Sequence, residues 1–185
     1  MSIATSPTRT AGALTDPTGR WQIDATRSTL GVAVRVGVLA TVHGRFQDVT
    51  GDLVMADDPL ASQVTVSIRT ASLTSGRSTV DSVLIGAGVV DTRRNPMLGF
   101  ASCGVRPTAH PDRWLLDGLL ATEGGLLDVT LEMATPQVLP DGSLRCHATG
   151  ALPSRDAVRL LSRPGLERML GRSMELDLVV VATRS

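Results

Sequence analysis

Few side chains in this sequence of 185 residues are suited to acid–base or nucleophilic chemistry, and their spacing does not bring them together. The histidines are His43, His110 and His147, and the cysteines are Cys103 and Cys146. Neighbouring residues of a strand face opposite sides, so Cys146 and His147 would not touch. The sequence has no C-x-x-C or H-x-x-x-H pair for a metal, no G-x-S-x-G elbow, and no lysine for a Schiff base. We therefore predict a protein that is not an enzyme and that uses no cofactor or metal.

The segment VLIGAGVVDTRRNPMLGF (residues 83–100) suggests one other chemistry, because its G-A-G at 86–88 resembles the start of a nucleotide-binding loop. A dinucleotide fingerprint requires a third glycine three residues later and a helix that meets the pyrophosphate. Asp91 occupies that position, and Pro96 follows too soon for a helix. We interpret residues 71–95 instead as an irregular connection whose apolar second half forms a flap across the mouth of a barrel.

Composition narrows the class of protein further. Eighteen basic residues balance 18 acidic residues, which argues against the basic surface of a nucleic-acid binder. Aromatic residues make up only 2% of the chain, so stacking on bases or sugars is also disfavoured. No apolar run reaches the roughly 18 residues of a membrane span, and the N-terminus has no apolar signal core, so we expect a cytoplasmic protein.

The domain organisation is simple. Residues 1–19 are rich in Thr, Ser, Pro and Gly and are predicted to be a disordered arm, whereas residues 20–185 are predicted to form one domain. Two cysteines in a chain of this size leave open whether Cys103 and Cys146 form a disulfide.

The domain itself has the alternation of β-strands. In STLGVAVRV the residues Leu30, Val32, Val34 and Val36 share one face, and similar runs recur to the C-terminus. Asp141-Gly142 between two such runs predicts a hairpin. One stretch, SRDAVRLLSRPGLERMLG (154–171), has helical spacing instead, with Ser154 as the expected N-cap and Gly171 as the stop. About eight antiparallel strands with one short helical insertion favour a barrel or a sandwich.

Three stretches carry a resemblance to a known family. They are WQIDATRSTLGVAVRVGVLATVHGRF, TASLTSG and VDSVLIGAGVVDTRRNPMLGF. They resemble, in order, three motifs of the YceI family, lipocalin-like proteins described as binding polyisoprenoid-type lipids. The resemblance spans roughly residues 20 to 183. It implies an all-β fold, an eight-stranded antiparallel lipocalin-like barrel with a short helical insertion before the last strand. It also implies a homodimer, as described for family members.

The chain keeps some family positions and departs from others. The retained residues are Asp24, Ser28, Asp81, Leu84, Asp91, Pro96 and Phe100. Arg27, Val36 and Val83 stand at family His positions, whereas Val32, Val89, Val90 and Asn95 replace aromatic residues. Each Phe-to-Val exchange removes about three to four carbons, which predicts a larger or differently shaped cavity unless the barrel contracts.

These observations predict a carrier that holds an elongated apolar ligand of isoprenoid, quinone or fatty-acyl type inside the barrel. The expected partner is thus an apolar small molecule or lipid. The predicted lining consists of Val32, Val34, Val36, Val42, Phe46, Val66, Leu84, Val89, Val90 and Phe100. Arg27, Arg93 and Arg94 are candidates for holding a polar head group at the mouth. The alternative is a collapsed barrel that acts as a structural or protein-interaction module, which the absence of an interior cavity would favour.

Overall fold

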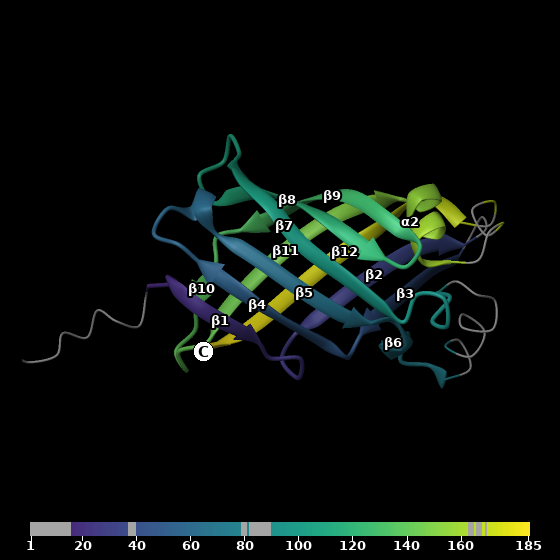
Figure 1. Ribbon diagram of the computed structural model, residues 1–185, viewed down its shortest axis with the longest axis horizontal. Coiled ribbons are helices and arrows are strands. Elements are labelled where there is room, and N and C mark those ends of the chain that lie inside the picture. The colour runs from purple at the N-terminus through teal and green to yellow at the C-terminus, as the bar shows by residue number, and fades with distance from the viewer. Residues whose placement is uncertain are drawn as a thin grey trace, which may run out of the picture.

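Alternating apolar and polar residues give most of this chain an extended conformation, and the strands close into a barrel with a short helix near one end (Figure 1). The computed structural model describes residues 16–36, 40–78, 81, 90–162, 165, 168 and 170–185. The strands of the first half are β1 (Gly19–Ile23), β2 (Thr29–Val36), β3 (Ala40–Phe46), β4 (Val49–Met55), β5 (Gln63–Arg69) and β6 (Leu73–Thr74). The second half contains β7 (Met97–Pro107), β8 (Arg113–Thr122), β9 (Gly125–Ala134), β10 (Gln137–Val138), β11 (Leu144–Pro153), α2 (Ser154–Leu161) and β12 (Leu170–Arg184). Short 3-10 helices cover Pro59–Ala61 and Thr70–Ser72.

The strands occupy eight positions around the barrel, which confirms the predicted eight-stranded antiparallel barrel. We call each position a stave, whether one strand or two consecutive strands fill it. Three staves are each made of two consecutive strands: β1 with β2, β3 with β4, and β5 with β6. The other staves are β7, β8, β9 continued by the short β10, β11, and β12. Pairing of β11 with β12 closes the ring.

The break between β1 and β2 is organised by two residues that the chain shares with the YceI motif. The Ser28 hydroxyl donates to the carbonyl of Asp24 (2.7 Å) and accepts from the amide of Val181 in β12 (3.0 Å). The Asp24 carboxylate accepts from the amide and the hydroxyl of Thr26 (2.9 and 2.6 Å). Hydrogen bonds from Thr26 therefore lower the pKa of Asp24 below its usual value. The chain can leave β1 and re-enter the same stave without losing its contact with β12.

The predicted hairpin at Asp141-Gly142 is present between β10 and β11. Gly142 adopts a φ of 81°, a left-handed conformation that suits glycine, and its amide donates to the carbonyl of Leu139 (2.9 Å). The Asp141 carboxylate accepts from the amide and the hydroxyl of Ser143 (3.0 and 2.6 Å), which fixes the turn.

The helical insertion is shorter than the sequence predicts. The helix α2 ends at Leu161, and β12 begins at Leu170, so Gly171 lies in a strand and is not a helix stop. A side chain at Gly171 would lie 2.7 Å from Cβ of Arg35 in β2, so close strand packing explains this glycine. The N-cap is Pro153 and not Ser154, whose buried hydroxyl has no hydrogen-bond partner among the described residues.

Close packing between neighbouring staves predicts different effects of adding one methyl group at two glycines. A Cβ at Gly51 in β4 would collide with the carbonyl of Thr65 and lie 3.0 Å from Cα of Val66, whereas nothing lies within 4 Å of one at Gly104. We expect Gly51→Ala to lower the free energy of unfolding by about 1–3 kcal/mol. Gly104→Ala, the matched control, should change it by less than about 0.5 kcal/mol. Urea unfolding of both variants checks this, and equal stabilities would contradict the close approach of β5 to Gly51.

Candidate functional site: an apolar cavity inside the barrel

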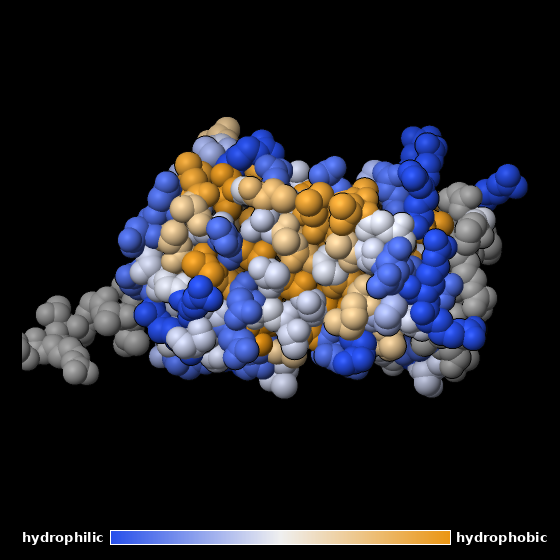
Figure 2. Space-filling view, in the orientation of Figure 1, coloured by the Kyte–Doolittle hydropathy of each residue, from blue (hydrophilic) through white to orange (hydrophobic). Residues whose placement is uncertain are grey.

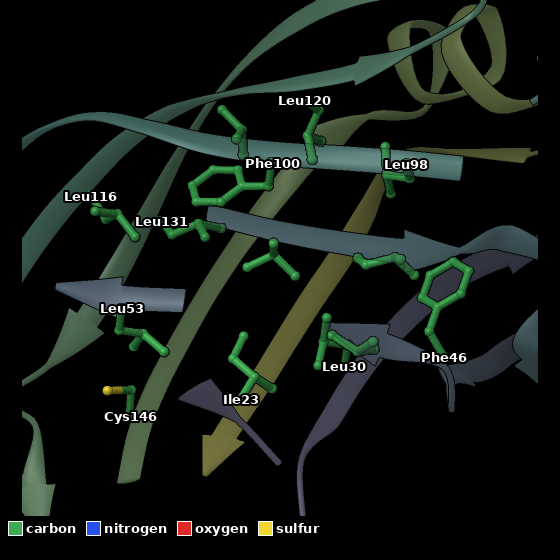
Figure 3. Close-up of a cluster of buried hydrophobic side chains, with 14 of the residues drawn as sticks. Ile23, Leu30, Phe46, Leu53, Leu98, Phe100, Leu116, Leu120, Leu131 and Cys146 are labelled. Carbon is green, nitrogen blue, oxygen red and sulfur yellow. The ribbon is translucent and has the colours of Figure 1, made fainter. Parts of the chain in front are cut away.

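The inward-facing residues of the staves surround a cavity of about 160 Å³. Figure 3 shows part of this interior, with Phe100, Leu116 and Leu131 on strands of one wall and Ile23 and Leu30 on the other. No charged side chain belongs to the described lining, and its polar atoms are limited to groups such as the Cys146 thiol and the Ser162 hydroxyl. Such a site can hold an apolar molecule by exclusion of water, but it offers no acid, base or anion-binding group.

The residues predicted for the lining fall into three groups. Seven of them line the cavity: Val32, Val34, Val42, Phe46, Val66, Val90 and Phe100. Val36 is half-buried at the end of β2 and is not among the lining residues. Leu84 and Val89 lie outside the described residues, as does most of the predicted apolar flap.

The second half of the chain contributes much of the lining that the sequence analysis missed. These residues include Leu116, Leu120, Val129, Leu131, Met133, Cys146, Ala148, Leu152, Leu161, Met174, Leu176, Leu178 and Val180. Alternation along β8, β9, β11 and β12 was the available signal, because every second residue of these strands faces inward. In β11, for example, Cys146 faces the cavity, whereas His147 lies outside with its Nε2 atom 2.7 Å from the Asp177 carboxylate.

One end of the barrel, near the C-terminus, is sealed by side chains with no exposed surface. Trp21, Leu144 and Ala182 are each 0% exposed. The indole Nε1 of Trp21 donates to the carbonyl of Pro17 (2.8 Å), and the Arg184 guanidinium lies 4.8 Å from the ring centroid. The helix α2 lies at the opposite end, where Val90, Leu161 and Ser162 line the cavity (Figure 1).

At the α2 end, hydrogen bonds join the residues that precede β7 to neighbouring elements. The amide of Asp91 donates to the carbonyl of Leu161 at the end of α2 (2.8 Å). Asn95 is 1% exposed, and its side-chain oxygen accepts from the amide of Gly124 in the β8–β9 turn (3.0 Å). The Thr70 hydroxyl donates to the backbone carbonyl of Asn95 (2.5 Å). The buried side-chain amide of Asn95 stands where the family motif has an aromatic residue, and it was not among the predicted site residues.

The three candidate arginines are not brought together. Arg27 lies in the β1–β2 connection and forms an ion pair with Asp141 of the β10–β11 turn (2.9 Å). Arg93 and Arg94 are exposed in the turn before β7, at the α2 end. Of the three, only Arg93 and Arg94 therefore lie at the α2 end.

The titratable groups near the site have structural roles. The Asp81 carboxylate accepts from the amide of Ser75 (2.5 Å) and the hydroxyl of Thr74 (2.6 Å), and these bonds lower its pKa. Burial raises the pKa of the Cys146 thiol to about 12. Both cysteines are free, Cys103 exposed and Cys146 buried. Among the described residues, no three His, Cys, Asp or Glu side chains are grouped as metal ligands, and no helix is long and apolar enough to cross a bilayer.

A closed antiparallel barrel with an apolar interior defines the class of fold, and comparison with known proteins identifies the family. The YceI-like domain matches residues 21–177, so the chain belongs to the YceI family. No curated protein matches the sequence.

Solved structures of low sequence identity share the fold. BcnA of Burkholderia cenocepacia is 15% identical, with a TM-score of 0.73 over 87% of this chain and 99% of its own. A polyisoprenoid binding domain from Saccharophagus degradans, implicated in plant cell wall breakdown, is 14% identical, with a TM-score of 0.63 over 89% and 98% of the two chains. The YceI protein of Campylobacter jejuni is 17% identical, with a TM-score of 0.65 over 82% and 90%.

The two cysteines should differ in reactivity, because the thiolate is the reactive form. At about pH 8.5, iodoacetamide should modify the exposed Cys103 readily and leave the buried Cys146 intact in the folded protein. Mass spectrometry should show one fast-reacting thiol per chain, none in Cys103→Ser, and two in the denatured protein. Equal rates for both thiols in the folded state would contradict the burial of Cys146.

Proposed function

We propose that this protein is a non-enzymatic carrier that holds the chain of an elongated apolar ligand, of isoprenoid, quinone or fatty-acyl type, inside its barrel. The observation that carries the proposal is the uncharged, almost entirely apolar lining of the interior cavity. Membership of the YceI family and the likeness to a polyisoprenoid binding domain support it. A cytoplasmic location and a homodimer stay predictions.

Apolar contact alone can supply useful affinity in such a cavity. Each buried CH₂ contributes about 0.8 kcal/mol, so a five-carbon isoprene unit contributes about 4 kcal/mol. The cavity of about 160 Å³ is of the size that holds one benzene-sized molecule. A longer chain therefore requires the lining to repack, for which the unbranched side chains of Met133 and Met174 are suited. The cavity also favours the carrier over the collapsed interaction module.

We propose further that an anionic head group, where the ligand has one, lies outside the cavity beside Arg93 and Arg94. The described lining offers no charged partner for it, and burial of an unpaired charge is costly. Guanidinium groups at the α2 end can pair with phosphate or carboxylate while the apolar chain lies inside.

The proposal is tested first by native mass spectrometry of the purified protein, followed by organic extraction and identification of what is released. A defined adduct that extracts as an isoprenoid, quinone or fatty-acyl compound is the expected result. A clean apo mass, together with no rise in melting temperature on addition of prenyl lipids, would overturn it in favour of the interaction module.

Filling the cavity should abolish binding. Ala148 on the inner face of β11 lines the cavity, whereas Ala151 of the same strand is exposed on its outer face. Ala148→Phe adds a benzene-sized ring to a cavity of that size, so we expect at least a tenfold loss of affinity for a prenyl alcohol. Ala151→Phe is the matched control and should bind as the wild type does. The melting temperature of each variant checks folding, and unchanged affinity in a folded Ala148→Phe protein would contradict the proposal.

The head-group role is tested by neutralising the two arginines. Arg93→Ala/Arg94→Ala should weaken binding of a prenyl phosphate by about tenfold, because charge-assisted hydrogen bonds contribute about 1.5–3 kcal/mol and these groups are exposed. Binding of the uncharged prenyl alcohol should stay constant. Arg27→Ala is the control, since Asp141 already pairs with Arg27. Equal losses for alcohol and phosphate would argue against a head-group contact.

A further inference from the structure

The charges of this neutral chain are unevenly distributed over the barrel. Six arginines are exposed on the turn before β7, on α2 and on the described residues between α2 and Arg172: Arg93, Arg94, Arg155, Arg159, Arg168 and Arg172. We call these six residues the arginine rim. The described carboxylates of these segments and of the adjacent β8–β9 turn are Asp91, Asp156 and Glu123. The rest of the described chain has ten arginines and fourteen carboxylates, so the rim end is positive and the remainder negative.

The rim arginines also lack carboxylate partners among the described residues. Of the ten other described arginines, four form ion pairs with carboxylates, namely Arg27, Arg69, Arg106 and Arg113. Within the described part of the chain, no rim arginine has such a partner. Unpaired guanidinium groups attract anions more effectively than groups that a carboxylate already neutralises. Figure 2 shows hydrophilic residues gathered over this end of the barrel.

Helix α2 presents two rim arginines together because of its amphipathic sequence. Ala157, Val158, Leu160 and Leu161 are buried, and α2 packs against β8, β9, β11 and β12. Arg155 and Arg159, four residues apart, are exposed and therefore share the opposite face.

Two exposed apolar side chains lie near these charges. Of the large hydrophobic residues that are exposed in the described structure, Met97 and Leu126 are on this side, whereas Leu60 lies in the β4–β5 connection. Leu126 is 70% exposed just after the β8–β9 turn, and Met97 is 42% exposed just after the turn that carries Arg93 and Arg94. Exposed leucine and methionine beside arginines match the interface of a bilayer, where head groups are charged and the acyl region begins directly beneath.

We propose that the arginine rim docks the α2 end of the barrel on an anionic lipid bilayer. The inference rests on the proposed carrier function for its purpose: because Trp21, Leu144 and Ala182 close the other end, the α2 end would face the phase from which an apolar ligand enters. Each arginine near an anionic surface strengthens binding by about fivefold, and the effect falls off within a Debye length. Leu126 adds an apolar contact with the acyl region of the bilayer, which charge alone does not provide.

Vesicle flotation with ligand-free protein tests the proposal. Binding is expected to vesicles of phosphatidylcholine mixed with phosphatidylglycerol, and not to phosphatidylcholine alone. It should weaken when salt rises from about 0.1 M to about 1 M, because the Debye length falls from about 10 to about 3 Å. Absence of binding to the anionic vesicles at the lower salt concentration overturns the proposal.

Two charge variants locate the surface. Arg155→Gln/Arg159→Gln should weaken vesicle binding by about twenty-five-fold. Arg20→Gln/Arg145→Gln removes the same charge from exposed residues outside the rim and should have a much smaller effect. Equal losses in both variants would show that net charge, and not the rim, determines binding. Circular dichroism and melting temperature confirm that each variant is folded.

Two further variants separate docking on a bilayer from the binding of another polyanion and from the carrier function. Leu126→Ser should weaken vesicle binding without changing the charge, whereas binding of an RNA or an acidic protein to the arginines would not need this leucine. Ala148→Phe should lose the apolar ligand yet keep vesicle binding, so failure of the carrier function is distinguishable from failure of docking. Retention of RNA in place of vesicles would also overturn the proposal.

Discussion

The register of strand β12 is the constraint on which the rest of the barrel depends. This strand of 15 residues pairs with β11 along one edge and with β2 and then β1 along the other. A slip of one residue would turn its inward side chains, such as Leu176, Leu178 and Val180, to the outside. The same slip would separate Val181 from Ser28, whose hydroxyl holds the β1–β2 break. The contacts of β12 therefore fix both the closure of the barrel and the stave formed by β1 and β2.

Much of the fold could be predicted from the sequence because alternation is a local property. Leu30, Val32 and Val34 share a face in any β-strand, and the structure places all three at the cavity. The hairpin at Asp141-Gly142 was equally local, since the turn needs only a glycine with positive φ and an aspartate that accepts nearby hydrogen bonds. The YceI resemblance added the order of the strands and the closure into a barrel.

The arrangement of the ends could not be predicted in this way, because it depends on contacts between distant segments. Arg27 and Arg93 were both candidates for holding a head group, yet Arg27 is held by Asp141, more than a hundred residues away along the chain. Asn95 stands where the family motif has an aromatic residue, and only the structure shows that Gly124 and Thr70 bond to it and that it is buried. The closed end at Trp21 likewise depends on two residues far apart in the sequence: the Pro17 carbonyl accepts from the indole nitrogen, and the Arg184 guanidinium lies over the ring.

Replacement of aromatic residues by valine did not leave a large empty interior. Family positions occupied here by Val32 and Val90 line a cavity of only about 160 Å³. Leucines from the second half of the barrel, among them Leu116, Leu120 and Leu131, occupy the space around it. Leucine and methionine side chains can adopt other rotamers at modest cost. A rigid aromatic ring that moves within a packed core needs another space as large as the ring. A cavity lined by such side chains can therefore widen around a flexible chain.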